Sequence, residues 1–460
     1  MFFSKLVQVV SLLALGLPVA RGVLIPSIDP FYRPPAGFES KAPGTILGIR
    51  SIIPSFLGLI PDLGVQAYQL LYRTTAINGS AIAGVTTVFK PLIAHTDRFV
   101  SFHTAYDGSA TICNPSYSYQ LGALQINLIS SVEMLLLQAF LLEGYIVSSP
   151  DYEGPDAAFI AGRLEGMVAL DSMRAVANFR KTLGLSTKTP KIVGYGYSGG
   201  SAATGWAASL HQAYASELQV KGWAQGGTVA NITGTIIFQD KTLFAGFLPA
   251  GIAGLIKPSA YGAQLQPILQ RIGTPYGKKI VQIASTVCGV EDLFVFAGGS
   301  ILSTDFQTLG PDFLYESTIA GVLEQNKMGL YANETPTAPV YMFHASKDEI
   351  IPYSDASTLN SAWCNDGASV NFVTYGSGGH LTTEIVGFID AFKFVQSAFA
   401  GTVAPGCMSS TVLSSKLDPL ALGLNLEPVL IGLVNALLVL GDGDSNVKSN
   451  LSTLNQTVPS

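Results

Sequence analysis

The chain has 460 residues, which is enough for one large domain with insertions or for two ordinary domains. Charged residues make up only 12% of it, and the net charge is −6 without any run of five basic residues. A nucleic-acid-binding protein would carry a basic stripe, so we expect no nucleic-acid partner.

Hydrophobic residues make up 48% of the chain, enough to bury a large core, which excludes an intrinsically disordered protein. The longest uncharged apolar runs are residues 6–20, 243–256 and 428–441. Each is shorter than the roughly 18–20 residues that cross a membrane as a helix. We therefore expect no transmembrane segment.

The first 22 residues are typical of a secretory signal peptide. Lys5 supplies the positive charge, residues 6–20 form the apolar region, and small residues at Ala20 and Gly22 favour cleavage after Gly22. The protein is therefore expected to be secreted and extracellular. Glycosylation sequons fit that expectation and begin at Asn78, Asn231, Asn333, Asn450 and Asn455.

The chain has four cysteines, an even number that predicts two disulfides in an exported protein. Four cysteines can pair in three ways. Cys364 and Cys407 bracket one predicted strand and helix, which favours that pair and leaves Cys113 with Cys288. No CxxC pair or Cys/His cluster has metal-ligand spacing, so we expect no metal site.

Residues 23–50 are rich in proline and glycine and are predicted to form an extended arm. From about residue 84, short β-branched runs alternate with longer helical patterns. Strands are predicted at residues 86–89, 99–102, 145–149, 191–194, 339–343 and 370–374. Helices are predicted at residues 132–142, 162–179, 199–214 and 355–363, with a final helix whose apolar face spans residues 381–395. This alternation predicts an α/β fold with a mainly parallel sheet covered on both faces.

Two segments interrupt this alternation within a main domain predicted to span residues 23–410. Residues 238–315 form an apolar insertion, and the tail, residues 411–460, contains a leucine-rich helical pattern. Both segments could simply belong to the core. We favour the alternative, in which they form a cap and a flap over an apolar cleft.

The most informative motif is Gly196-Tyr197-Ser198-Gly199-Gly200, a G-x-S-x-G pattern that follows a predicted strand and opens a predicted helix. This context is the one that a nucleophile elbow requires. Glycines allow the sharp turn and the close approach of strand and helix. Ser198 is therefore the candidate nucleophile.

A different motif overlaps these residues. Gly194, Gly196 and Gly199 match the dinucleotide-binding pattern G-x-G-x-x-G, with Glu217 at roughly the expected distance downstream. We consider this reading weaker, because the motif usually opens a domain and because Tyr195 and Tyr197 would crowd a pyrophosphate.

A serine nucleophile needs a base, and the candidates are the five histidines His95, His103, His211, His344 and His380. His380 follows a glycine-rich loop after a strand and directly precedes a long helix, which fits a base at the carboxyl end of the sheet. His344 ends a predicted strand, but it precedes the candidate acids. The acid is expected between Ser198 and His380. Asp348 is our choice, ahead of the adjacent Glu349 and of Asp355.

Eight stretches, in the same order along the chain, carry a resemblance to a known family. They are residues 31–32 (FY), 72–75 (YRTT), 113–119 (CNPSYSY), 148–154 (SSPDYEG), 158–162 (AFIAG), 196–200 (GYSGG), 348–353 (DEIIPY) and 379–385 (GHLTTEI). On these residues the chain resembles the fungal secretory lipases of the yeast lipase A type over nearly its whole mature length.

The resemblance implies an α/β-hydrolase fold with an inserted helical cap and a C-terminal flap. It implies Ser198 as nucleophile, His380 as base and Asp348 as acid. The oxyanion hole would be formed by Gly199 and Asp107. It also implies two disulfides, one between Cys113 and Cys288 and one between Cys364 and Cys407. The glycine-rich approach to His380 and the very apolar tail depart from the family pattern.

These features together predict a secreted serine ester hydrolase, a triacylglycerol lipase or carboxylesterase that works through an acyl-enzyme. The alternatives are an esterase, deacetylase or acyltransferase acting on a small acylated metabolite, and a non-catalytic surface glycoprotein. We expect no metal or organic cofactor, a lipid or small acyl ester as substrate, transient contact with a lipid interface, and a monomer.

Overall fold

The computed structural model describes residues 22–413. The predicted signal peptide up to residue 21, the apolar tail from residue 414 and the sequons at Asn450 and Asn455 lie outside the described residues. Between residues 22 and 413, no helix is both long enough and apolar enough to cross a membrane.

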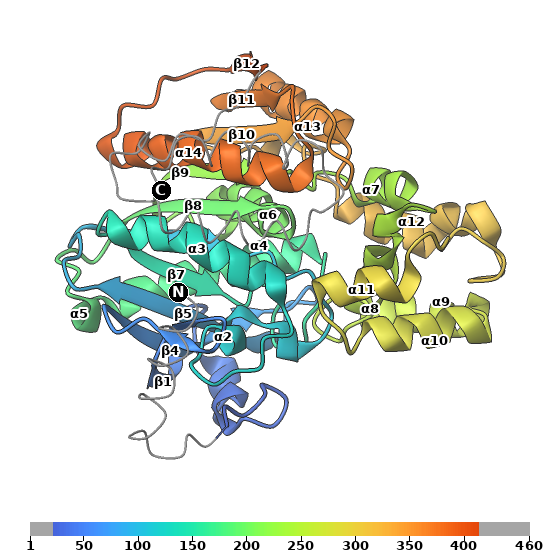
Figure 1. Cartoon of the computed structure of the whole chain (residues 1–460), viewed down its shortest axis with the longest axis horizontal. Coiled ribbons are helices and arrows are strands. Elements are labelled where there is room, and N and C mark those ends of the chain that lie inside the picture. The colour runs from blue at the N-terminus through green and yellow to red at the C-terminus, as the bar shows by residue number, and fades with distance from the viewer. Residues whose placement is uncertain (1–21, 414–460) are drawn as a thin grey trace, which may run out of the picture.

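One large sheet runs through the described part of the molecule (Figure 1). Its ten strands in spatial order are β1 (Ile46–Ile52), β4 (Val65–Thr75), β5 (Ala81–Pro91), β7 (Ile146–Pro150), β6 (Arg98–His103), β8 (Lys191–Tyr197), β9 (Gln219–Gly226), β10 (Val340–Ala345), β11 (Val370–Tyr375) and β12 (Met408–Val412). The pairs from β1 to β7 are antiparallel, and all pairs from β7 to β12 are parallel. A separate hairpin pairs β2 (Ser55–Phe56) with β3 (Ile60–Pro61).

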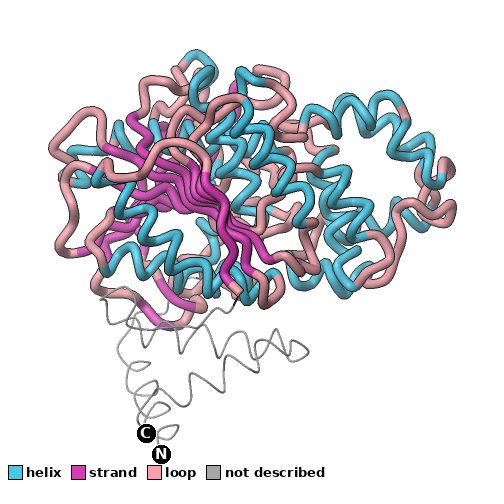
Figure 2. The backbone as a smooth tube through the Cα atoms, turned by 90° about the horizontal axis from the view of Figure 1, so that it is seen from above, coloured by secondary structure: helices cyan, strands magenta, loops and turns pink. Residues whose placement is uncertain are grey.

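Helices cover both faces of this twisted sheet (Figure 2). On one face lie α3 (Leu128–Leu142) and α14 (His380–Ala400), whose rings Phe140 and Phe392 stack with centroids 5.0 Å apart. On the other face lie α4 (Gly162–Asn178), α6 (Gly199–Tyr214) and α13 (Tyr353–Asn365). Shorter elements are η1 (Pro30–Tyr32), η2 (Phe38–Ser40), η3 (Thr111–Cys113), α2 (Pro115–Ser118), α5 (Arg180–Leu183) and η6 (Ala332–Glu334). The buried parallel strands explain why the sequence shows short apolar runs rather than alternation.

The predicted strands and helices are present, most of them with longer bounds, but several strands were missed. The arm predicted over residues 23–50 ends in strand β1. β9 reads QVKGWAQG, a composition poor in β-branched residues, yet neighbours on both sides force it into the sheet. β12 was missed because it is an exposed edge strand with little apolar pattern.

A helical insertion lies between β9 and β10, at one end of the sheet (Figure 1). Its elements are α7 (Ile232–Gln239), η4 (Leu243–Gly246), α8 (Phe247–Leu255), α9 (Gly262–Ile272), α10 (Pro275–Ala284), α11 (Gly289–Phe296), η5 (Gly310–Tyr315) and α12 (Ser317–Gln325). It contains the segment 238–315 that we expected to form a cap. A disulfide between Cys113 and Cys288 connects it to the region after β6, and a second joins Cys364 to Cys407.

The structure separates the three described sequons by exposure. Asn78, in the turn between β4 and β5, and Asn333 are exposed. Asn231 is only partly exposed, and its side chain bonds to Asp355. We therefore expect glycans at Asn78 and Asn333, and an unmodified Asn231, when glycopeptides of the secreted protein are analysed by mass spectrometry. A fully occupied Asn231 would contradict this expectation.

Candidate active site

Ser198 lies at the sharp turn between β8 and α6. Its backbone has φ 51° and ψ −123°, a conformation that residues with a side chain rarely adopt. Its N–H donates to the carbonyl of Gly226 over 3.0 Å. A Cβ at Gly196 would collide with the carbonyl of Gly200, and one at Gly200 would collide with that of His103. The glycines of the motif are thus required by close backbone approach, as a nucleophile elbow demands.

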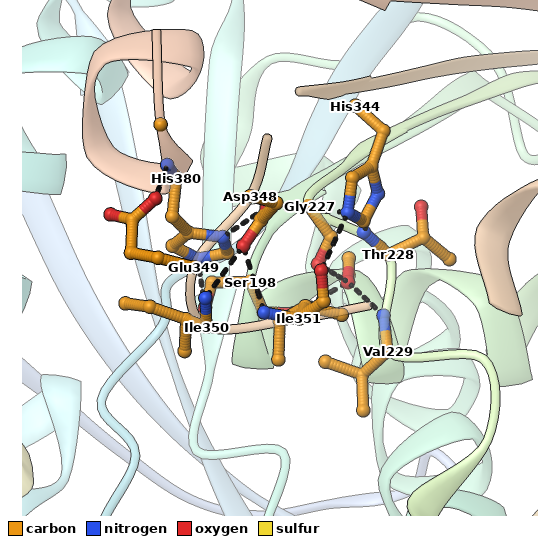
Figure 3. Close-up of polar contacts among 12 residues, drawn as sticks. Ser198, Gly227, Thr228, Val229, His344, Asp348, Glu349, Ile350, Ile351 and His380 are labelled. Atoms are coloured by element: carbon orange, nitrogen blue, oxygen red, sulfur yellow. Dashed lines mark hydrogen bonds and ion pairs between the residues drawn. The ribbon is translucent and has the colours of Figure 1, made fainter. Parts of the chain in front are cut away.

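His380 is the first residue of α14 and faces Ser198 (Figure 3). Its Nε2 lies 2.8 Å from the Ser198 Oγ, and its ring packs against Tyr197, whose hydroxyl donates to the His380 carbonyl over 2.6 Å. Interaction with Asp348 raises the pKa of His380 above its usual value, although burial opposes that shift. The ring is therefore held in place by contacts on several sides.

Asp348 completes a chain of three side chains. One of its carboxylate oxygens, Oδ2, lies 2.7 Å from His380 Nδ1, and the other accepts the N–H groups of Ile350 and Ile351 at 2.9 and 2.8 Å. Burial opposes ionisation, but the charges and hydrogen bonds of His380 and His344 hold the pKa of Asp348 well below its usual value. The group that faces the imidazole is thus a carboxylate.

The structure also separates Asp348 from the two alternative acids. Glu349 does not face the His380 ring; its Oε2 accepts the His380 backbone N–H over 2.9 Å. That carboxylate lies so close to Gly379 that a Cβ there would collide with it, which explains part of the glycine-rich approach to His380. Asp355, in the first turn of α13, bonds to Asn231 instead.

His344, which the sequence analysis left without a role because it precedes the candidate acids, is a contact of Asp348. The backbone N–H of Thr228 donates to His344 Nδ1 over 3.0 Å, so a neutral ring carries its proton on Nε2. This Nε2 lies 3.2 Å from the same oxygen of Asp348 that faces His380. Its position, four residues before Asp348 at the end of a strand, was the only sequence signal available.

The other histidines lie elsewhere. His103 is fully buried between Ser101 and Thr204, and burial lowers its pKa to about 3. His211 bonds to the carbonyl of Leu218 at the far end of α6. His95 packs against Tyr145.

Asp107 lies in the loop after β6, against the start of α6. Its backbone has a positive φ of 41°, and its carbonyl accepts the N–H of Gly289, which follows Cys288. A Cβ at Gly199 would collide with the Asp107 carboxyl group. Burial raises the pKa of this carboxyl to about 6. Asp107 and Gly199 are therefore adjacent beside Ser198.

The dinucleotide reading finds no support. Glu217 forms an ion pair with Arg174 rather than facing a ligand site. Our reason for doubting it was wrong in one respect, because the side chains of Tyr195 and Tyr197 point into the core and would not crowd a pyrophosphate. The glycine pattern instead permits the strained turn at Ser198.

An apolar pocket opens beside Ser198 and extends into the helical insertion. Of the residues that line it, five have polar side chains: Asp107, Ser198, Thr235, Gln239 and Gln307. The remainder are apolar residues and glycines, among them Ile160, Ile236, Phe247, Leu248, Ile252 and Leu265. Part of the segment 243–256 therefore lines this pocket, while Leu248 and Leu255 also belong to the main core.

Comparisons with known proteins give the family of the chain. The family model "Secretory lipase" matches residues 120–406. A secreted triacylglycerol lipase of Malassezia furfur, LIP1, is 40% identical over 407 residues, which cover 87% of this chain and 82% of that protein. The chain belongs to the secretory lipase family. LIP7, a secreted triacylglycerol lipase of Malassezia globosa, is 37% identical, and the match covers 81% of this chain and 79% of that protein.

A solved structure of Candida antarctica lipase A in its closed state is 31% identical, with a TM-score of 0.80 over 89% of this chain and 95% of that one. The chain is thus a secreted carboxylic ester hydrolase with an α/β-hydrolase fold, and those predictions are confirmed.

The contacts of Asp348 and Glu349 lead to opposite expectations for two neighbouring substitutions. Asp348→Asn should lower kcat on a soluble short-chain ester by about 10⁴-fold, because an amide no longer selects the required imidazole tautomer. Glu349→Gln keeps an oxygen for the His380 N–H and should cost less than about tenfold. Steady-state kinetics at one pH would check the ranking. If Glu349→Gln is the more damaging, Asp348 is not the acid.

Proposed function

We propose that this protein hydrolyses long-chain acyl esters, triacylglycerols among them, with Ser198 as nucleophile, His380 as general base and Asp348 as the orienting carboxylate. The observation that carries the proposal is the Ser198–His380–Asp348 hydrogen-bonded chain at the mouth of an apolar pocket. The secreted triacylglycerol lipases among its relatives support this choice of substrate.

In the first half-reaction, His380 Nε2 takes the proton of the Ser198 hydroxyl as Oγ attacks the ester carbonyl carbon. Asp348 keeps the imidazole proton on Nδ1 and stabilises the imidazolium that forms. His380 then gives its proton to the alcohol oxygen, which leaves as the acyl-enzyme forms. Water, activated by the same imidazole, attacks the acyl-enzyme and releases the fatty acid.

The negative charge that develops on the carbonyl oxygen needs donors that are already in place. We assign this part to the backbone N–H groups of Gly199 and Asp107. Gly199 is the first residue of α6, where N–H groups have no partner within the helix and the helix dipole favours negative charge. The carbonyl of Asp107 is held by Gly289, which fixes the loop from the side of the insertion.

The pocket supports a long acyl chain as the group transferred. Its lining from α8 and α9 is entirely apolar, and burying a chain there is worth about 0.8 kcal/mol per CH₂ group. A small acylated metabolite would leave most of this lining without contact.

Chemical labelling tests the nucleophile. A fluorophosphonate probe should label Ser198 stoichiometrically, and Ser198→Ala should lower kcat by about 10⁴-fold or more. Labelling is followed by mass spectrometry of the modified peptide. Undiminished labelling of the alanine variant, or full hydrolysis of emulsified triacylglycerol by it, would place the chemistry elsewhere.

Acyl-chain preference tests the pocket. Gly251, on α8, lines the pocket, and a Cβ there would meet only a side-chain carbon of Ile160 at 3.4 Å. Gly251→Leu should therefore fill the pocket and lower kcat/KM for p-nitrophenyl palmitate by at least about tenfold relative to the butyrate. Such a ratio corresponds to about 1.4 kcal/mol, roughly two CH₂ groups of lost burial.

Gly321→Leu is the matched control, because Gly321 lies on α12, where a Cβ would meet no atom within 4 Å and the residue does not line the pocket. It should leave the chain-length preference unchanged. An equal loss on both esters in Gly251→Leu would mean that the pocket does not hold the acyl chain. A preference of the unaltered enzyme for acetyl esters would favour a small acylated substrate.

A further inference from the structure

Two buried carboxyl groups connect the two sides of the active site. Glu133 on α3 is 1% exposed and Glu384 on α14 is 6% exposed. Their side chains are hydrogen-bonded to one another. Glu133 Oε2 also accepts the backbone N–H of Ala105 over 2.6 Å. Glu384 lies one helical turn after His380, and Ala105 lies two residues before Asp107.

A hydrogen bond between two carboxyl groups requires a proton, and the surroundings of this pair retain one. Burial raises the pKa of Glu133 well above its usual value and that of Glu384 to about 7. A protonated Glu133 fits both contacts: its hydroxyl donates to Glu384 while Oε2 accepts from Ala105. The pair interacts electrostatically with the following titratable groups: Asp107, Tyr119, Tyr152, Tyr195, Tyr197 and His380. Lysine and arginine are not among them.

The loop that Glu133 holds is in close contact with the nucleophile turn. The carbonyl of His103 and the N–H of Ala105 lie against Gly200. The Thr104 hydroxyl bonds to Tyr119 and Ser149, and the Asp107 carbonyl bonds to Gly289. The hydrogen bond from Ala105 to Glu133 differs from these contacts. Through Glu384 it connects the loop to α14, the helix that carries His380.

We propose that Glu133 and Glu384 are positioning residues that hold residues 104–107 at the required distance from His380, and that loss of their shared proton sets the alkaline limit of activity. The inference rests on the proposed function, because it takes His380 as the base and this loop as an oxyanion donor.

The step itself is a simple proton transfer. Hydroxide removes the proton of the Glu133 carboxyl group and becomes water. Two carboxylates then face each other in a buried site, and their repulsion breaks the link between the loop and α14. Because the loop acts on the transition state rather than on bound substrate, kcat falls while KM changes little.

Two substitutions of Glu133 separate position from charge. Glu133→Leu removes both hydrogen bonds and should lower kcat at pH 7 by about tenfold to a hundredfold, with KM within about twofold. Glu133→Gln can accept from Ala105 with its amide oxygen and donate to Glu384 with its amide nitrogen, but it has no proton to lose. It should recover most of the kcat that the leucine variant loses and move the alkaline limb of the profile upward by at least about one pH unit.

The profiles are measured with tributyrin in a pH-stat, with a return to pH 7 to separate reversible loss from unfolding. Glu143→Gln, at the C-terminal end of the same helix, is the matched control and should reproduce the profile of the unaltered enzyme. If Glu133→Gln has the same alkaline limb as the unaltered enzyme, the proposal is wrong, even where the leucine variant fails to fold. Failure of the proposed function would look different, because Ser198→Ala would then remain active.

Discussion

The structure depends on one close approach, that of the loop after β6 to the turn between β8 and α6. Ser198 adopts a strained backbone there, with φ 51°, and the carbonyl of His103 passes where a Cβ of residue 200 would lie. Such a strained backbone conformation persists only where many surrounding contacts hold it in place. The glycines of the motif permit the approach. The bond from Gly289 to Asp107, next to the Cys113–Cys288 disulfide, and the bond from Ala105 to Glu133 hold the loop from two sides.

The sheet topology brings the rest of the site to this point. Ser198 follows β8, Asp348 follows β10 and His380 follows β11, so three residues far apart in the sequence meet at the carboxyl ends of parallel strands. Ligands of open α/β sheets bind at this edge for the same reason. The helical insertion after β9 emerges from the same edge, which places its apolar lining next to Ser198. The catalytic residues and the acyl-binding residues thus come from different segments, which leave the sheet at the same edge.

Much of this arrangement could be predicted from the sequence because its signals are local. The G-x-S-x-G pattern between a strand and a helix predicted Ser198 as the nucleophile, and a histidine after a strand near the end of the domain predicted His380 as the base. Local patterns could not separate Asp348 from Glu349, since adjacent residues point in different directions only once the loop is folded. The buried pair of Glu133 and Glu384 gave no signal, because neither belongs to a motif and the two residues are 251 positions apart in the sequence. The central strand β9 was missed since its neighbours, rather than its composition, determine it.

The buried acids give the protein opposing pH requirements. Burial raises the pKa of several carboxyl groups in the folded chain: Asp107 to about 6, Asp151 to about 7, Glu165 to about 8 and Asp292 to about 9. Above pH 4 these four groups bind more protons in the folded state than in the unfolded chain, so their contribution to the free energy of unfolding decreases as the pH rises through this range. Asp348, with its lowered pKa, acts in the opposite sense only in strong acid. His380 must be neutral to accept the Ser198 proton, and its raised pKa moves the acid limit of catalysis upward. These buried acids thus favour the folded state in acid, while the base requires a higher pH.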